Sequence, residues 1–413
     1  MPVDRSRNPK LQVAFLTGEY PPMQGGIADH ITYLADYMTP LGVDSSILIS
    51  HRWKETANNH QLALSKEQLP IYPVIPNWSW RCWPAIVKFL NTHQPDVLHI
   101  QYQAAAFDLG GWVNWLPWYL KKRHTATKIV TTFHDLRIPY IFPKAGPVRW
   151  KSMLALARYS DAVICTDREN IHTLQNQLPT TNHQLPILTH IPLGNNVEPQ
   201  PPPDFDRNKW RAKHNVQNNT LLLVYFGFLN QSKGGEELIE ALALLRQQGI
   251  DAQLLFIGGD VGDADPTNAA YAQRVQALID QHGLTHFVHR TGYVELSAVS
   301  ANLLAADAVV MPYRDGVSFR RTTLIAALRH GCPVISTTPA NPDLIPEIES
   351  GENMLLASPH NAFALAQTIA PLADDHHLRH KLSAGARQLG NLFKWDKIAG
   401  QTANLYKAIT GNC

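Results

Sequence analysis

Two glycine-containing segments of the sequence combine features that bind anions. The first is Thr17-Gly-Glu-Tyr-Pro-Pro-Met-Gln-Gly-Gly, in which Gly25 and Gly26 stand where a helical pattern begins; the second is Tyr225-Phe-Gly-Phe-Leu-Asn-Gln-Ser-Lys-Gly, which contains Gly227 and Lys233. Glycine lets the backbone approach a ligand closely, and free amides at the start of a helix favour an anion or a polar sugar. The ammonium of Lys233 adds a positive charge to the second segment. Tight turns and a solvated surface lysine are the alternative interpretations.

A third segment, Tyr313–Val334, places cations immediately before a helical pattern. Arg320 and Arg321 precede Thr322 and Thr323, where the helix is expected to begin. Cations at this end oppose the helix dipole unless an anion is present. Backbone amides near the two threonines, with an arginine beside them, are therefore predicted to bind phosphate. Exposed cations at the start of a helix are the alternative.

A histidine and an acidic loop follow two other apolar runs. His134 ends Thr131-Thr-Phe-His-Asp, and its neutral imidazole would donate or accept a hydrogen bond, with Asp135 orienting it. Gly258 opens a loop containing Asp263 and Asp265, which could bind a divalent cation. The glycine spacing of this loop departs from the dinucleotide-binding pattern GxGxxG.

Short runs rich in Val, Ile and Leu alternate with helical patterns, which predicts an α/β fold with parallel sheets covered by helices on both faces. Strands are expected in the first half at Leu11–Leu16, Ser46–Ile49, Val97–Ile100, Ile129–Thr132 and Ala162–Cys165, and in the second half at Leu221–Phe226, Leu254–Ile257, Ala308–Met311 and Pro333–Ser336. The helix after the first strand presents one apolar face, formed by Ile27, Ile31, Leu34, Met38 and Leu41, and Gly42 ends it.

The proline-rich stretch Val197–Asp204 predicts a linker between two domains, 1–198 and 204–390. In parallel sheets of this kind, ligands bind at the carboxyl ends of the strands. Two such sheets that face each other across an interdomain cleft would suit a reaction with two substrates.

The order of these motifs, from Gly18 to Tyr406, resembles family 4 of the retaining glycosyltransferases, which have the GT-B fold of two Rossmann-like doubly wound domains. The resemblance implies that segment 391–413 crosses back to the N-terminal, acceptor-side domain as a helix. It also implies transfer of a sugar from a nucleotide-diphosphate sugar to a hydroxyl acceptor, such as a glycan, a lipid-linked molecule or a small molecule. Neither a metal nor a cofactor beyond the donor substrate is implied.

The resemblance assigns roles to individual residues. The residues expected to act in catalysis are His134, which contacts the transferred sugar, Lys233, which contacts the diphosphate, and Ser318. The residues expected to bind the donor are Gly25, Gly26, Gly227, Lys233, Gly258, Gly292, Tyr293, Asp315, Gly316, Ser318, Arg320, Arg321, Thr322 and Thr323. The loop after Gly258 is expected to line the nucleotide pocket.

The sequence departs from the family pattern at three positions. Counting back from Gly331 places Ser318 and Ala326 where the family has two glutamates, although counting from Pro312 brings Asp315 near the first; Phe228 replaces an arginine. These departures leave two alternatives open. One is a non-catalytic partner that binds a nucleotide sugar and supports another transferase, and the other is a GT-B sugar epimerase.

Composition limits the partners and the setting of the protein. A net charge of +2 on 413 residues, without a clustered basic surface, argues against nucleic acid. Four scattered cysteines and the lack of an apolar run of ~18 residues fit a cytoplasmic protein. Trp112, Trp115, Trp118 and Tyr119 precede Lys121–Arg123, which predicts either core packing or peripheral contact with the inner face of a membrane. The oligomeric state stays open.

Overall fold

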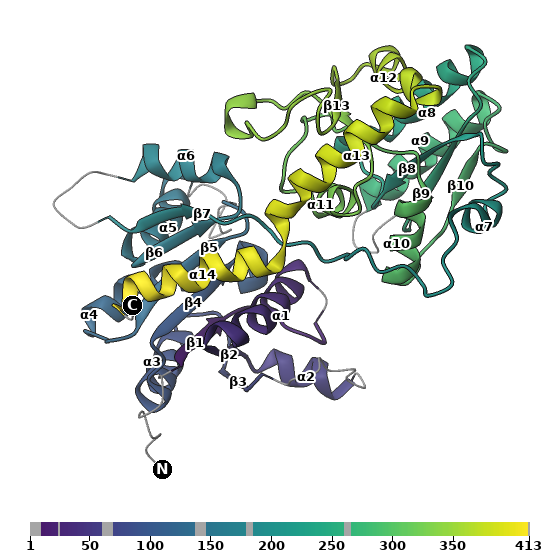
Figure 1. The fold of residues 1–413 in the computed structure, drawn as a ribbon. Coiled ribbons are helices and arrows are strands. Elements are labelled where there is room, and N and C mark those ends of the chain that lie inside the picture. The colour runs from purple at the N-terminus through teal and green to yellow at the C-terminus, as the bar shows by residue number, and fades with distance from the viewer. Residues whose placement is uncertain are drawn as a thin grey trace. The chain divides into compact units, whose positions relative to one another are not determined.

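The computed structural model describes residues 10–23, 25–59, 69–136, 146–178, 185–259 and 266–411, and the chain divides into two compact units (Figure 1). Unit 1 comprises Met1–Gly194 together with Trp395–Cys413, and unit 2 comprises Asn195–Lys394. The first division thus lies a few residues before the proline-rich stretch Val197–Asp204, and the second lies four residues after the expected position 390.

Unit 1 is built on a parallel sheet. Within the described residues its seven strands lie in the order β3-β2-β1-β4-β5-β6-β7. Their bounds are β1 (Leu11–Leu16), β2 (Val43–Ser50), β3 (Ile71–Ile75), β4 (Val97–Tyr102), β5 (Lys128–Phe133), β6 (Ala162–Cys165) and β7 (Ile187–His190). All five strands predicted for this half exist, and β3 and β7, at the two edges of the sheet, were not predicted.

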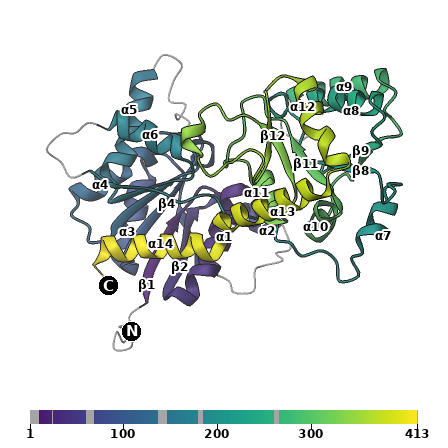
Figure 2. The same cartoon turned by 45° about the horizontal axis from the view of Figure 1, so that its top comes forward.

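Helices cover both faces of this sheet. Their bounds are α1 (Gly26–Met38), α2 (Arg52–Asn59), α3 (Cys82–His93), α4 (Leu116–Lys122), α5 (Gly146–Tyr159), α6 (Arg168–Gln177) and α14 (Trp395–Thr410). One apolar core joins the sheet to α1 and α14, and another joins it to α3, α4, α5 and α6. The last helix, α14, lies beside α1 in unit 1 (Figures 1 and 2). The predicted first helix ends at Met38, and a 3₁₀ turn, Thr39–Leu41, leads to Gly42 in the left-handed conformation.

Unit 2 repeats the parallel α/β plan. In its described residues, six strands lie in the order β10-β9-β8-β11-β12-β13, with β8 (Leu221–Phe226), β9 (Ala252–Ile257), β10 (Val288–Arg290), β11 (Ala308–Met311), β12 (Val334–Thr337) and β13 (Leu355–Ala357). The four predicted strands form the centre of this sheet, and the short strands at its edges, β10 and β13, were not predicted.

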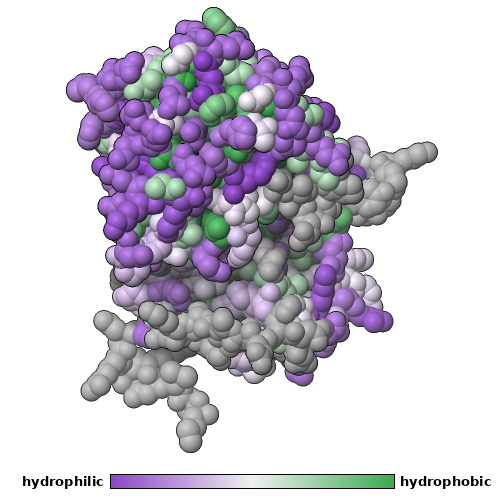
Figure 3. All heavy atoms as spheres, turned by 90° about the vertical axis from the view of Figure 1, so that its right-hand side faces the viewer, coloured by the Kyte–Doolittle hydropathy of each residue, from purple (hydrophilic) through white to green (hydrophobic). Residues whose placement is uncertain are grey.

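The helices of unit 2 are α7 (Arg207–Ala212), α8 (Gly235–Gln247), α9 (Pro266–Gln281), α10 (Leu296–Ala305), α11 (Thr322–Arg329), α12 (Ala362–Ile369) and α13 (His376–Gly390). The main apolar core packs α8, α9 and α12 against the sheet. On the face of unit 2 that is visible in Figure 3, hydrophilic residues dominate and apolar residues occur singly or in small groups. No helix among the described residues has both the length and the apolar character needed to cross a bilayer.

Candidate functional site

The loop between β8 and α8 is folded tightly by two glycines. Gly227 has a φ of 116°, and its N–H donates to the carbonyl oxygen of Ile257 over 3.1 Å. Gly234, with a φ of 67°, stands so close to β11 that a Cβ there would lie 2.0 Å from the carbonyl oxygen of Pro312. Because only glycine fits this left-handed position, the loop holds Lys233, which precedes Gly234, at a fixed place beside the carboxyl end of β8.

Lys233 and the first turn of α11 converge around Gly227. A Cβ at position 227 would lie 3.3 Å from Cγ2 of Thr323 and 3.4 Å from Nζ of Lys233. That ammonium donates a hydrogen bond of 2.8 Å to the carbonyl oxygen of Phe228. Burial, and to a lesser extent repulsion from the guanidinium of Arg321, lowers the pKa of Lys233 to about 8. An anion placed here would relieve both effects.

Arg321, which immediately precedes α11, is held by a carboxylate and an aromatic ring. One of its terminal nitrogens lies 2.6 and 2.8 Å from the two carboxylate oxygens of Asp315. Its guanidinium carbon lies 4.7 Å from the centre of the Tyr313 ring. Arg320 is exposed, and both its backbone N–H and its Nε–H donate to Oγ of Ser318 over 3.3 Å. The alternative of two exposed cations at this helix start therefore fits Arg320 but not Arg321, whose charge Asp315 offsets, and the assignment of both arginines to donor binding stays a prediction.

The segment around Gly316 lies against β12. Gly316 has a φ of 82°, and a Cβ there would lie 2.6 Å from the carbonyl oxygen of Thr338. The structure thus brings Gly227, Lys233, Asp315, Arg321 and Thr323 to the carboxyl edge of this sheet. The side chain of Thr322 is exposed at the beginning of α11.

Gly258 and Gly292 meet at the same edge, after β9 and β10. Their backbones form an isolated antiparallel bridge, and the N–H of Gly258 donates to Oγ1 of Thr291 over 3.1 Å. The neighbouring side chain of Tyr293 is 87% exposed. Asp263 and Asp265, weighed above as metal ligands, lie outside the described residues; elsewhere in the described chain no group of three His, Cys, Asp or Glu side chains is placed to hold a metal ion.

Arg314 is a site feature that sequence reasoning missed. Its NH2 lies 2.6 Å from Oε2 of Glu236, and its Nε lies 2.7 Å from Oε1 of Glu237. This pairing ties the β11–α11 segment to the first turn of α8 next to Lys233. The adjacent glutamates of Gly234-Gly-Glu-Glu, set in the first turn of a predicted helix, were the available signal.

In unit 1, His134 follows β5 and is part of a buried polar cluster. Its ring Nε2 lies 2.8 Å from Oε1 of Gln101, and its ring lies edge-on to that of His30, with 4.9 Å between centroids. A carbonyl oxygen can only accept, so with the amide oriented in this way Nε2 carries the proton and Nδ1 is the acceptor. Burial, with His30 and His99 nearby, lowers the pKa of His134 well below its usual value and keeps the imidazole neutral.

Glu19 occupies the beginning of α1, where Gly25 and Gly26 were expected to receive a ligand. The N–H of Ile27 donates to Oε1 of Glu19 over 3.1 Å, and a Cβ at Gly25 would lie 2.1 Å from that same oxygen. Nothing lies within 4 Å of the corresponding position at Gly26. A carboxylate of the chain thus already accepts from an amide of this helix start, and the assignment of Gly25 and Gly26 to donor binding stays a prediction.

The tryptophan-rich segment before Lys121 is partly packed and partly exposed. Trp83 stacks on Tyr119, with ring centroids 4.7 Å apart, and its Nε1–H donates to the carbonyl oxygen of Trp112 over 3.0 Å. The side chains of Trp80 and Trp112 are 56% and 44% exposed. Core packing thus accounts for Tyr119, whereas the indole of Trp112 in this segment, and that of Trp80 outside it, remain at the surface.

Comparison with known proteins adds to this geometry. Residues 24–187 match the family described as Glycosyltransferase Family 4, and residues 206–389 match Glycosyl transferases group 1. The chain belongs to the family 4 glycosyltransferases. It is therefore a transferase enzyme, and its two parallel-sheet units with a C-terminal helix form the GT-B fold.

Curated relatives of this family 4 glycosyltransferase include two named D-inositol 3-phosphate glycosyltransferase. The one from Jonesia denitrificans is 25% identical over 88% of this chain and 82% of its own length, and the one from Corynebacterium glutamicum is 24% identical over 77% of this chain and 73% of its own length.

Two solved structures share the fold. Sucrose-phosphate synthase from Thermosynechococcus elongatus has a TM-score of 0.71 at 20% identity, and the alignment covers 98% of this chain and 100% of that one. Anabaena HepE in complex with UDP has a TM-score of 0.72 at 18% identity, covering 96% of this chain and 100% of that one.

Proposed function

We propose that this glycosyltransferase moves a sugar, with retention of configuration, from a nucleotide-diphosphate sugar to a hydroxyl acceptor. The observation that carries the proposal is the position of the Lys233 ammonium next to Gly227 and the first turn of α11. A Cβ at Gly227 would lie 3.4 Å from Nζ of Lys233. A half-buried cation, bare glycine backbone and helix amides are what a diphosphate leaving group requires.

In this proposal the diphosphate binds between Lys233 and the amides of Thr322 and Thr323. As the bond to the sugar breaks, negative charge grows on the leaving oxygen, and the nearby ammonium stabilises it. Retention follows if the acceptor hydroxyl attacks on the face from which the nucleotide departs and the leaving phosphate takes the proton of that hydroxyl. No protein nucleophile, metal ion or further cofactor is required.

Asp315 and Ser318 are proposed to replace the first of the glutamates on the transferred sugar. Asp315 is half-exposed, and its pairing with Arg321 fixes the carboxylate in one place while lone pairs remain for sugar hydroxyls. His134, with Nδ1 as acceptor, is proposed to receive a hydrogen bond from a sugar hydroxyl. These assignments rest on the position of each side chain at the carboxyl edge of its own sheet.

A panel of UDP-, GDP-, ADP- and dTDP-sugars in a thermal-unfolding assay tests the donor part of this proposal. HepE, which shares the fold, was solved with UDP and with UDP-glucose, so UDP-sugars are the first members of the panel. A ligand at ~100 times its Kd adds about 2.7 kcal/mol to folded-state stability. We expect one nucleotide class to raise Tm, and we expect Lys233→Ala but not the exposed-lysine control Lys209→Ala to reduce that shift.

Product analysis tests the chemistry itself. With the stabilising donor and mixed hydroxyl acceptors, NMR of the product should show the anomeric configuration of the donor sugar. An inverted product would reject the retaining mechanism, and no Tm shift with any nucleotide sugar would reject the donor site.

A non-catalytic nucleotide-sugar-binding partner is the second candidate function. It is favoured by α11, whose residues Thr322–Arg329 contain no glutamate, and by the buried Ala326 in the place of the second one. A donor that binds but yields no product with any acceptor would support it. Conversion of the donor sugar without an acceptor would instead indicate an epimerase.

We also propose that the exposed indoles of Trp80 and Trp112 contact a bilayer interface, which would bring a lipid-linked acceptor to unit 1. The guanidinium carbon of Arg81 lies 5.9 Å from the Trp80 ring, and the basic residues Lys121–Arg123 follow Trp112 in the sequence. Tryptophan favours the membrane–water interface, and basic groups favour anionic lipid. Sedimentation with anionic vesicles should fall in a Trp80→Ser/Trp112→Ser double variant; equal sedimentation would contradict membrane contact.

A further inference from the structure

The amino ends of β8, β11 and β12 surround a pocket of about 720 Å³ in unit 2. Thr220, Asp307 and Pro333, which immediately precede these strands, line it, and α13 contributes Arg379 and Arg387. The proposed donor residues lie at the opposite, carboxyl edge of the same sheet. Because β8 has six residues, the two edges are roughly 20 Å apart.

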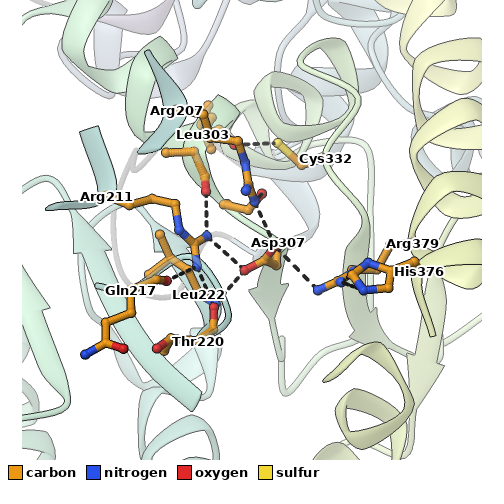
Figure 4. A network of polar contacts seen from close by, with 12 residues as sticks. Arg207, Arg211, Gln217, Thr220, Leu222, Leu303, Asp307, Cys332, His376 and Arg379 are labelled. Atoms are coloured by element: carbon orange, nitrogen blue, oxygen red, sulfur yellow. Dashed lines mark hydrogen bonds and ion pairs between the residues drawn. The ribbon is translucent and has the colours of Figure 1, made fainter. Parts of the chain in front are cut away.

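A single carboxylate in this pocket is shared by three arginines, which point toward it from different sides (Figure 4). Oδ1 of Asp307 lies 2.7 Å from NH2 of Arg207 and 3.5 Å from NH1 of Arg379, and Oδ2 lies 2.9 Å from NH1 of Arg211. The backbone N–H of Leu222 also donates to Oδ2 over 2.8 Å. The single negative charge of Asp307 therefore neutralises only one of the three positive charges.

The innermost arginine is fixed in the core. Arg211 has no exposed side-chain surface, and its guanidinium donates to the carbonyl oxygens of Ala305, at 3.1 Å, and Gln217, at 2.9 Å, as well as to that of Thr220. These neutral carbonyl oxygens accept hydrogen bonds from NH1 and NH2 without cancelling the charge of the guanidinium, and its buried Nε has no partner among the described residues. The buried charge of Arg211 thus makes the electrostatic potential of the pocket more positive, because solvent screens it only weakly.

Arg387 and His376 extend the cationic character of the pocket. Arg387 lies against Gly331, where a Cβ would come within 2.4 Å of its Nε, and no carboxylate of the described residues pairs with it. The ring of His376 contacts the guanidinium of Arg379. Asp374 also lines the pocket, so four arginines stand against the two carboxylates of Asp307 and Asp374 and leave an excess of +2.

We infer that this pocket binds a phosphate group, as the dianion of a phosphate monoester, at a site separate from the donor site. A dianion neutralises the excess of +2, and its oxygens can accept paired hydrogen bonds from the forked guanidinium groups of Arg207, Arg379 and Arg387. Arg207 and Arg379 keep 40% and 17% of their side chains exposed, so the ligand can reach them from solvent. The ligand is a free phosphate ion or a small phosphorylated molecule.

Binding to the full-length protein, measured by calorimetry and by ³¹P NMR, tests this inference. The probes are inorganic phosphate and glycerol 3-phosphate, with acetate as a singly charged comparison. The variants are Arg379→Gln/Arg387→Gln at the pocket and Lys233→Gln at the proposed donor site. The matched control is Lys381→Gln/Lys397→Gln, which removes the same charge from exposed positions. Arg207 and Arg211 still pair with Asp307 in the pocket variant, so it should fold, which circular dichroism checks.

We expect both phosphate probes to bind to the wild-type protein, the Lys233→Gln variant and the control with similar Kd, and the pocket variant to bind at least tenfold more weakly. Tighter binding of glycerol 3-phosphate than of inorganic phosphate would identify a phosphorylated molecule as the ligand, and the reverse would identify the free ion. No saturable binding, binding of acetate as tight as that of phosphate, or binding that survives in the pocket variant and disappears in Lys233→Gln would overturn the inference.

Discussion

Nζ of Lys233 lies 2.8 Å from the carbonyl oxygen of Phe228 and donates a hydrogen bond to it. An ammonium group has three hydrogens, so this bond fixes the direction of the side chain and leaves two donors for a ligand. Phe228 thus stands where the family pattern has an arginine, and its backbone carbonyl, rather than its side chain, contacts Lys233. Lys233 remains as the half-buried cation next to Gly227, and its protonation should govern the binding of anions there.

The affinity for a nucleoside diphosphate should fall as the pH rises above about 8. Burial lowers the pKa of Lys233 to about 8 in the free protein, and a bound diphosphate would raise the pKa again because it stabilises the ammonium. Below pH 8 the group is already charged, so no proton is needed. At pH 9, binding should take up close to one proton, which calorimetry in buffers of different ionisation enthalpy can count. Equal uptake in Lys233→Met would assign the proton to another group.

Replacing Lys233 with alanine should lower kcat/KM by roughly 30-fold or more, which corresponds to a loss of ~2 kcal/mol of transition-state stabilisation for a charged contact. The control is Lys209→Ala, an exposed lysine in α7 of the same unit, which should keep normal kinetics. Steady-state rates with the identified donor and acceptor measure both variants. Near-normal turnover by Lys233→Ala would remove Lys233 from the mechanism.

Gly234→Ala should destabilise unit 2 much more than Gly249→Ala. Both glycines flank α8 in the left-handed conformation, with φ of 67° and 82°, so alanine costs about 1–2 kcal/mol of backbone strain at either. At Gly249 the new Cβ meets nothing within 4 Å, whereas at Gly234 it would lie 2.0 Å from the carbonyl oxygen of Pro312. The clash should add about 1–3 kcal/mol, as overpacking does. Urea unfolding of the two variants gives the difference; similar midpoints would mean that the Pro312 backbone moves freely.

The sequence predicts the central strands because they are buried on both faces and therefore contain continuous apolar runs, as in Leu221–Phe226. The edge strands β3, β7, β10 and β13 could not be predicted, for physical reasons. Pro73 interrupts β3, Ile187 of β7 is 47% exposed, and β10 and β13 have three residues each. A short, half-exposed strand contains too few apolar residues to show a pattern, since partners in the sheet, rather than its own sequence, stabilise it.

The loop positions of the candidate site could also be predicted from the sequence, but the pairings within it could not. Glycine spacing located Gly227 and Lys233 next to a helix start. The bond of Arg321 to Asp315 closes a turn within one loop, and the bond of Arg314 to Glu236 joins two segments that are far apart in the sequence. Likewise, Glu19 reaches the amide of Ile27 across a turn. Such contacts depend on how loops pack at the edge of a sheet, which neither spacing nor composition specifies.

Unit 1 should lose stability as the pH falls from about 6.5 toward 4. Burial lowers the pKa of His30 to about 4. Burial, together with repulsion from the nearby His30, lowers the pKa of His99 to about 3. In the unfolded chain these imidazoles have a pKa of ~6.5, so below that pH the unfolded state binds more protons than the folded state. Each of the two groups should reduce the free energy of unfolding by up to about 1.4 kcal/mol per pH unit in this range.

His30→Leu separates this effect from general acid sensitivity. Nδ1 of His30 has no hydrogen-bond partner, so leucine loses little there, and the variant should show a pH slope shallower by about 1.4 kcal/mol per pH unit below pH 6. Tryptophan fluorescence during urea unfolding is a suitable measurement, because Trp210 is the one tryptophan of ten that falls in unit 2, and Trp210→Phe leaves a signal from unit 1 alone. His282→Leu, at an exposed position of unit 2, is the control and should leave the slope unchanged. A wild-type slope in His30→Leu would contradict the prediction, because protonation of His30 would then not contribute to the loss of stability of unit 1 in acid.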